Sequence, residues 1–126
     1  MKKILQAAAI SVCITNAYAD AKVPSQFQGK WAPTSDCRKA KNPQDTEAAM
    51  SVVQIDATSV SYGEAQCSLT KVSAAEASHL DGMFDCQGDG VGGKVALSLK
   101  LEGGKLRLVD KAGSIWRSTE ALPRCK

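Results

Sequence analysis

The glycine-rich segment at residues 88–93, Gly-Asp-Gly-Val-Gly-Gly, matches the G-x-G-x-x-G pattern that cradles pyrophosphate in dinucleotide-binding folds. In those folds the glycines open a helix whose N-terminal amides face the phosphates. Here the following residues, 94–102, alternate between polar and apolar types as a strand does. We therefore predict that the segment is a turn or a bulge, and we expect no cofactor.

Three aspartates, Asp81, Asp85 and Asp89, recur every four residues among glycines and suggest a calcium site. An EF-hand loop needs ligands at every second residue and a distal glutamate, and this spacing is absent from the sequence. Aspartate beside glycine is common in turns, where its side chain bonds to nearby backbone. We expect these residues to stabilise turns, and we predict no metal site.

His79 is the single histidine of the chain and could serve as a general base or a metal ligand. Ser73 and Ser78 lie nearby in sequence, but neither sits in the G-x-S-x-G context of an activated serine, and there is no second histidine. The sequence favours a surface histidine in a loop.

Glu64, Asp85 and Glu102 could act as the paired carboxylates of a glycoside hydrolase if the fold brought them together. Nothing in the sequence selects them over the other acidic residues. No catalytic residue is predicted, the protein is not expected to be an enzyme, and a hydrolase is the least favoured function.

Residues 1–19 have the three parts of a bacterial Sec-type signal peptide. Lys2 and Lys3 are basic, residues 4–14 are mostly apolar, and Ala17-Tyr18-Ala19 is a small-x-small cleavage site. The apolar run is shorter than the ~20 residues that span a bilayer. We expect cleavage after Ala19, leaving residues 20–126 as a single β domain that is periplasmic or secreted, with no stable membrane association.

Loss of the signal changes the charge of the chain. Lys2 and Lys3 leave with it, so the cleaved chain keeps 14 of the 16 basic residues and all 13 acidic residues. A chain so close to neutral has no broad basic field for nucleic acid or for an anionic membrane. Neither is expected as a partner.

Period-two patterns and turn residues predict an all-β fold of about seven or eight short antiparallel strands, an up-and-down barrel or a sandwich. The clearest strand is 94–102, where Val95, Leu97 and Leu99 share a buried face before the hairpin turn Gly103-Gly104. The other strands are expected near 27–31, 51–55, 59–62, 65–72, 83–86, 106–108 and 114–119. Residues 34–45 are predicted to be a surface connection with helical turns between 42 and 50, and residues 73–80 show no clear period.

Cys37, Cys67, Cys86 and Cys125 remain after Cys13 leaves with the signal. An even number of cysteines in a small exported domain predicts disulfides, and no close C-x-x-C pair indicates zinc. Cys67 and Cys86 fall on strands expected to pair, while Cys37 and Cys125 follow the first and last strands. Because those strands become neighbours in a closed meander, we predict the pairs 67–86 and 37–125.

The first strand is predicted to be anchored by Phe27, Gly29 and Trp31, which share one face of an extended segment. A Gly-x-Trp motif on the first strand of an exported β meander resembles the calycins, lipocalins and avidins. In lipocalins an arginine near the last strand packs over this tryptophan, so the resemblance implies that role for Arg117 or Arg124. It also implies a barrel that holds a small apolar ligand.

Two functions are considered for this domain. The first is a binding module that engages another protein through surface loops, as an inhibitor or an immunity protein does. The alternative is a calycin-like carrier of a small apolar ligand. The first is preferred, because the expected inward residues are Leu and Val, which fill a small barrel.

Overall fold

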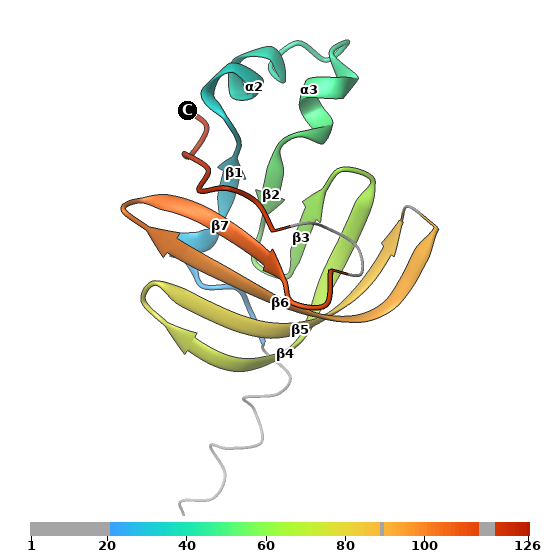
Figure 1. The fold of residues 1–126 in the computed structure, drawn as a ribbon, viewed down its shortest axis with the longest axis vertical. Coiled ribbons are helices and arrows are strands. Elements are labelled where there is room, and N and C mark those ends of the chain that lie inside the picture. Colours follow the sequence, from blue (N-terminus) through green and yellow to red (C-terminus); the bar gives the residue numbers. More distant parts are fainter. Residues whose placement is uncertain (1–20, 89, 114–117) are drawn as a thin grey trace, which may run out of the picture.

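The computed structural model describes residues 21–88, 90–113 and 118–126, and the predicted signal peptide lies outside them. Seven antiparallel strands follow each other in chain order through one nearly closed barrel (Figure 1), which confirms the predicted all-β, up-and-down fold. The strands are β1 Gly29–Trp31, β2 Val53–Ile55, β3 Ser59–Tyr62, β4 Ala65–Glu76, β5 His79–Gly88, β6 Val91–Glu102 and β7 Lys105–Asp110.

Three short helices accompany the strands. They are the 3-10 helix η2 Ser25–Phe27 before β1, and the α-helices α2 Thr34–Lys39 and α3 Thr46–Met50 between β1 and β2. Figure 1 shows α2 and α3 side by side at one end of the barrel. The prediction that residues 34–45 are only a connection was wrong, because α2 occupies half of that segment. No helix in the described part of the chain is long and apolar enough to cross a bilayer.

The C-terminal segment, residues 119–125, closes the barrel on the β7 side. Leu106 and Leu122 exchange two backbone hydrogen bonds of 2.8 and 2.7 Å. The Thr119 amide donates to the Leu108 carbonyl, and the Leu108 amide donates to the Thr119 hydroxyl. The strand expected at 114–119 falls largely outside the described residues, and Ser118 and Thr119 belong to no strand.

The same segment pairs with β1 on its other side. Arg124 forms an antiparallel bridge with Trp31, and the Cys125 amide donates to the Lys30 carbonyl at 2.7 Å. β1 is only three residues long, so it does not reach β7 by itself. The C-terminal segment fills the gap between the first and last strands.

Arg124 covers the indole of Trp31. Its guanidinium carbon lies 4.1 Å from the ring centroid, in the range of a cation–π contact. The guanidinium also donates to the carbonyls of Gln28 and Gln26. Trp31 is 1 % exposed, and its Nε1 donates to the Phe27 carbonyl at 3.0 Å. Of the two arginines that the resemblance implied, Arg124 is the one that packs over Trp31, and Arg117 lies outside the described residues.

Gly29 makes room for this arginine. A Cβ atom at Gly29 would lie 2.5 Å from Arg124 Nη1, and its φ of 127° is a conformation that favours glycine. Gly29 is half-buried rather than part of the core as predicted. Phe27 is fully buried but lies in η2, not on the first strand.

The barrel interior is built from the inward positions of the strands. Val95, Leu97 and Leu99 of β6 are buried as predicted. The other core members come from every strand and from the segments at both ends of the barrel: Val23, Phe27, Trp31, Val53, Ile55, Val60, Ala65, Cys67, Leu80, Phe84, Cys86, Leu106, Leu108 and Leu122.

Both disulfides have the predicted pairing. Cys67 and Cys86 stand opposite each other in the β4–β5 ladder, with Cα atoms 4.0 Å apart, and both are buried. Cys37 of α2 is joined to Cys125, with Cα atoms 5.3 Å apart. The second bridge therefore fastens the helical end of the barrel to the closing segment.

β4 and β5 are longer than their sequence patterns predict. β4 continues to Glu76, and β5 starts at His79, so residues 73–80 form a hairpin. Cross-strand pairing overrides the weak helical preference of the Ala-Ala-Glu-Ala stretch. Gly103-Gly104 forms the expected turn with positive φ angles of 58° and 79°. Residues 88–93 were predicted to form a turn or a bulge, and Gly92 and Gly93 lie within β6.

Replacing Trp31 with alanine should lower the free energy of unfolding by about 3–5 kcal/mol, the usual cost of removing a fully buried large aromatic. Chemical denaturation measures the change. Met50→Ala is the control, because Met50 is 43 % exposed and its loss should change stability by less than about 0.5 kcal/mol. A loss below about 1 kcal/mol for Trp31→Ala would contradict a buried anchor.

Gly29→Ala should lower the free energy of unfolding by about 1–3 kcal/mol. The new methyl clashes with the Arg124 guanidinium, and the positive φ at residue 29 is strained for alanine. Arg124→Ala should also destabilise the fold, through loss of the Trp31 contact. The double variant lacks the clash. Its loss of unfolding free energy should therefore be smaller than the sum of the losses in the two single variants by at least about 0.5 kcal/mol. Strictly additive losses would show that the two residues do not interact.

Candidate functional site

The three carboxylates considered for glycoside hydrolysis do not converge. Glu64 lies in the β3–β4 turn beside Gly88, and Asp85 stands opposite Lys94 in the β5–β6 ladder at the same end of the barrel. Glu102 ends β6, about 25 Å further along the strand at ~3.3 Å per residue. Paired catalytic carboxylates stand only about 5–10 Å apart. Glu102 instead pairs with Arg107 at 3.2 Å.

The aspartates considered for calcium also lie apart. Asp81 and Asp85 are inside β5 rather than in turns, which corrects the predicted role. Four residues along a strand separate them by about 13 Å. Asp89 lies outside the described residues, and within the described part of the chain no group of three His, Cys, Asp or Glu side chains could hold a metal ion.

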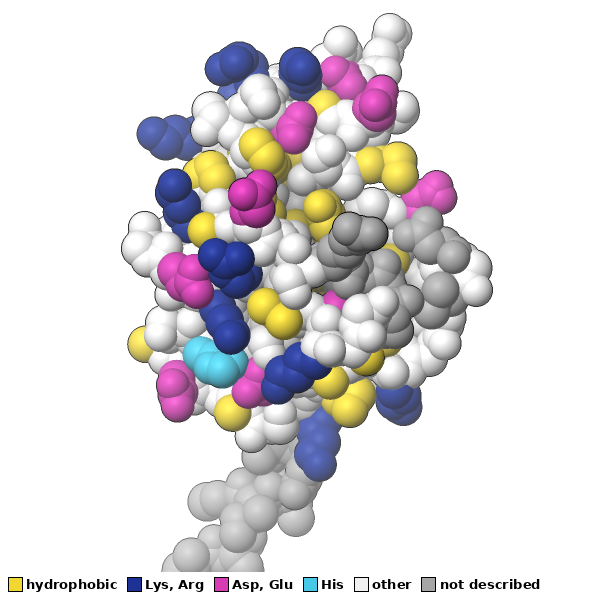
Figure 2. Space-filling model, viewed as in Figure 1, with side chains coloured by type: hydrophobic (Ala, Val, Ile, Leu, Met, Phe, Trp, Pro, Cys, Tyr) yellow, Lys and Arg dark blue, Asp and Glu magenta, His cyan; other side chains and the backbone are white. Residues whose placement is uncertain are grey.

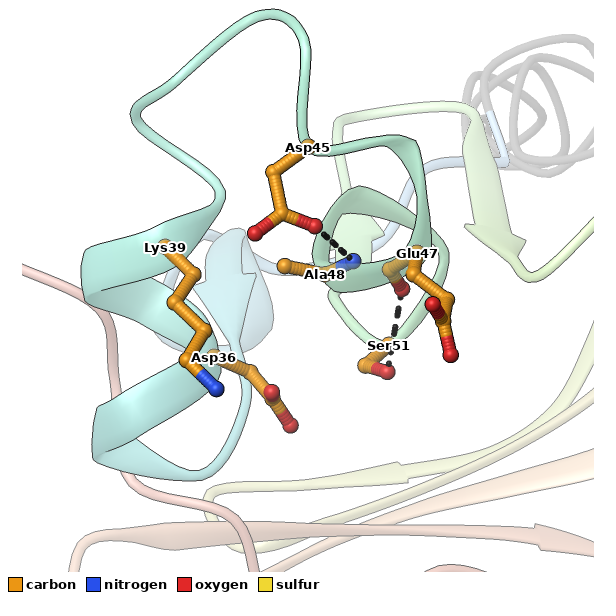
Figure 3. A pocket seen from close by; sticks show the side chains of 6 residues that line it. All are labelled: Asp36, Lys39, Asp45, Glu47, Ala48 and Ser51. Atoms are coloured by element: carbon orange, nitrogen blue, oxygen red, sulfur yellow. Dashed lines mark hydrogen bonds between the residues drawn. The ribbon is translucent and has the colours of Figure 1, made fainter.

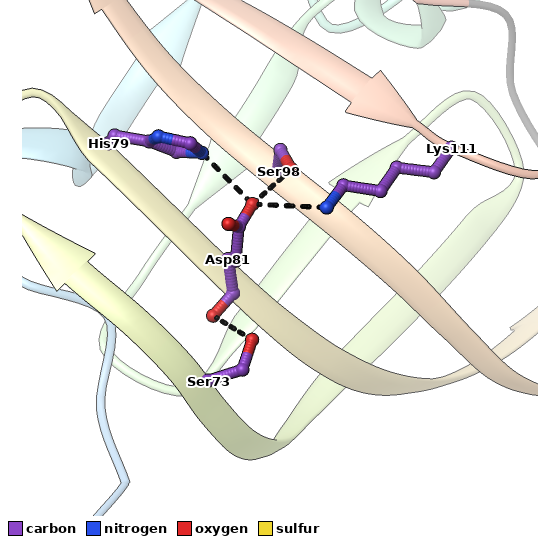
Figure 4. A network of polar contacts seen from close by, with 5 residues as sticks. All are labelled: Ser73, His79, Asp81, Ser98 and Lys111. Carbon is purple, nitrogen blue, oxygen red and sulfur yellow. Dashed lines mark hydrogen bonds and ion pairs between the residues drawn. The ribbon is translucent and has the colours of Figure 1, made fainter.

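Asp81 is instead the centre of a polar network on the outside of the barrel (Figure 4). One carboxylate oxygen accepts a hydrogen bond from the Ser98 hydroxyl and lies 2.9 Å from His79 Nε2 and 3.6 Å from Lys111 Nζ. The Ser73 hydroxyl donates to the Asp81 backbone carbonyl. His79 is the first residue of β5, so the prediction that it lies in a loop was wrong.

The network contains Ser, His and Asp but lacks the order that activates a nucleophile. An active serine gives its proton to a histidine, which the aspartate orients from the other side. Here Ser98 and His79 contact the same oxygen of Asp81. Ser98 is 1 % exposed, so its hydroxyl is closed to substrate. The network joins β5 and β6 to Lys111, the residue that follows β7.

The network also fixes the charge of Asp81. The Ser98 hydrogen bond holds the pKa of the Asp81 carboxyl below its ordinary value of 3.8, with smaller contributions from His79 and Lys111 and some opposition from burial. The carboxylate side chain is 22 % exposed. The ionised form is therefore stabilised in the folded protein.

An acidic pocket lies between α2 and α3 (Figure 3). Asp36 and Lys39 point into it from α2, while Asp45 and Glu47 border it from the α3 side. Asp45 is the N-cap of α3 and accepts the Ala48 amide at 3.0 Å. The side chain of Asn42 accepts the Gln44 amide in a separate turn.

A larger groove lies on the opposite flank of α2, between that helix and the C-terminal segment. Its volume is about 430 Å³, within the range of small-molecule sites. We call it the basic groove. Its lining residues are Thr34, Cys37, Arg38, Lys41, Pro123, Arg124, Cys125 and Lys126. A smaller hollow of about 130 Å³ adjoins it across the Cys37–Cys125 disulfide and adds Lys30 to its wall.

Exposed cations line the basic groove and the adjoining hollow. Lys30, Arg38, Lys41 and Lys126 are exposed, and none of them takes part in the ion pairs found among the described residues. Figure 2 shows Lys and Arg side chains gathered at the upper left, over α2 and the C-terminal segment, with acidic side chains nearer α3. α2 thus separates a basic flank from an acidic one.

The sequence contained a signal for this groove. Thr34, Cys37, Arg38 and Lys41 follow the spacing i, i+3, i+4 and i+7, which places them on one face of a helix. Asp36 and Lys39 are three apart on the other face. The signal was missed because the segment was predicted to be irregular.

Asp81→Asn should make stability less dependent on pH between about pH 5 and pH 2. The pKa of Asp81 is lowered in the folded state, so its contribution is complete above the ordinary value of 3.8 and is lost as pH falls through the lower folded value. The gap in unfolding free energy between the wild type and Asp81→Asn should therefore be widest near neutral pH and shrink in acid. Asp85→Asn, an exposed position on the same strand, is the control, and equal pH profiles for the two variants would contradict this role.

No protein-family model matches the chain, and neither a curated protein nor a solved structure matches it. The likeness to lipocalins and avidins therefore stays a prediction, which rests on Gly29, Trp31 and the arrangement of the strands.

Proposed function

We propose that the protein is an exported binding module that engages another protein through the helical end of its barrel, as an inhibitor or an immunity protein does. The observation that carries this proposal is the basic groove. It is an exposed recess that combines unpaired charge with apolar lining, which a partner could fill. Two disulfides and the predicted signal peptide are compatible with an oxidising compartment outside the cytoplasm.

Side chains fill the interior of the barrel, which supports the proposal that binding takes place on its outer surface. Trp31, Phe27 and Phe84 are fully buried within it, together with the inward leucines of β5, β6 and β7. Small barrels are commonly filled by their own side chains in this way, whereas a carrier needs space for its ligand. The carrier alternative would require these residues to move apart.

The helical end is also held in a fixed shape. The Cys37–Cys125 disulfide joins the two walls of the basic groove, and the Cys125 amide donates to Lys30 of β1. A surface that is ordered before binding loses less conformational entropy when the partner arrives. Such a surface suits a module that acts by binding rather than by chemistry, and we propose no catalytic role for it.

The proposal can be tested by photocrosslinking in the cells that produce the protein. A photoreactive phenylalanine analogue is placed at Thr34, in the basic groove, and at Gln66, which is exposed on β4 outside the groove. We expect irradiation to give one discrete protein adduct at position 34 and none at position 66.

No adduct at position 34, or equal adducts at both positions, would contradict the proposal. Native mass spectrometry of the unmodified protein provides a second measurement. A small apolar molecule retained at one copy per chain would favour the carrier instead.

A further inference from the structure

We infer that the partner presents an acidic segment, a run of Asp or Glu side chains, that lies in the basic groove between α2 and the C-terminal segment. This inference rests on the proposed function, because it specifies the chemistry of the surface that the partner offers. The residues that would bind the segment are Arg38, Lys41 and Lys126, with Lys30 at the adjoining hollow.

These cations have no ion-pair partner in the part of the chain that the structure describes. Within the described residues, ion pairs join His79 and Lys111 to Asp81, and Arg107 to Glu102. The groove cations take no part in these pairs. Like charges that face one recess repel each other, and an anionic partner would relieve that repulsion.

The shape and lining of the basic groove also suit a peptide segment. It is an open recess with Pro123 and the Cys37–Cys125 disulfide among its lining residues. The long stems of arginine and lysine add apolar surface below their charged ends. A peptide segment can bury its own apolar atoms on this lining while its carboxylates meet the cations at the edge.

The acidic residues near α2 lie on the side away from the basic groove. Asp36, Asp45 and Glu47 line the pocket on the other flank of α2 (Figure 3). They would repel an acidic segment that approached from that side. The two flanks together fix where an acidic segment can lie, which gives specificity as well as attraction.

The charge of the whole chain favours a protein over a nucleic acid or a membrane. The basic and acidic residues that follow the predicted signal nearly balance, 14 against 13. Nucleic acids and anionic membranes are usually bound through broad fields that exceed the area of one recess. A short acidic segment needs only the local charge that the groove supplies.

The probe for this inference is a peptide of ten glutamates, added to the isotope-labelled, oxidised protein and followed by NMR. We expect the amide shifts to concentrate in residues 34–41 and 122–126. Binding should weaken when the salt concentration rises from about 20 to 150 mM, because salt screens exposed charges. Vesicles containing phosphatidylglycerol and a ten-nucleotide single strand of DNA are titrated in parallel.

Charge-reversal variants test the assignment of the groove. Arg38→Glu with Lys41→Glu should weaken peptide binding at least tenfold. Lys22→Glu with Lys71→Glu changes the net charge equally at exposed positions outside the groove, and it should weaken binding less than twofold. All four side chains are exposed, so thermal unfolding of both double variants should stay close to that of the wild type.

Three results would overturn the inference: equal losses in the two double variants, shifts spread over the barrel, or tighter binding to the vesicles or the DNA than to the peptide. The crosslinking adduct at Thr34 separates the two proposals. If that adduct forms equally well in Arg38→Glu with Lys41→Glu, a protein partner exists but is not held by these charges. If no adduct forms in any background, the proposed function itself is wrong.

Discussion

The structure depends on how the two edges of its sheet are joined. β1 has three residues, too few to form a full edge for β7, so the C-terminal segment lies between them and pairs with both. Arg124 then covers Trp31, and Cys125 is bonded to Cys37. An exposed strand edge can pair with other chains, so the segment that covers parts of β1 and β7 protects these edges as well as joining them.

The closing segment also builds the proposed binding surface. Pro123, Cys125 and Lys126 form one wall of the basic groove, and α2 forms the other. The disulfide between these walls constrains a loop of 88 residues, and in a chain-entropy model such a loop contributes about 4–5 kcal/mol of stability. The stability of the fold and the proposed binding surface therefore depend on the same contacts, and damage to the closure should disturb both.

Much of the fold follows from local patterns in the sequence. The alternation in β6, the Gly103-Gly104 turn and both disulfide pairs were predicted, because each depends on period-two patterning or on neighbours in a meander. The full lengths of β4 and β5 were not predicted, since the Ala-rich end of β4 and the start of β5 become strands only through pairing with each other. The basic groove was missed for a related reason. Arg38 and Lys126 form one surface only after the closing segment meets α2.

The most direct test of this account is native-state hydrogen exchange of the amides that close the barrel. Those of Ala32, Leu106, Leu122 and Cys125 donate to carbonyls across the junction between the closing segment and the strands. If the closure is part of the cooperative fold, they should exchange as slowly as the β5 and β6 amides, with opening free energies near that of global unfolding. If they exchange as fast as an exposed loop while β5 and β6 stay protected, the segment is only loosely attached, and the account is wrong.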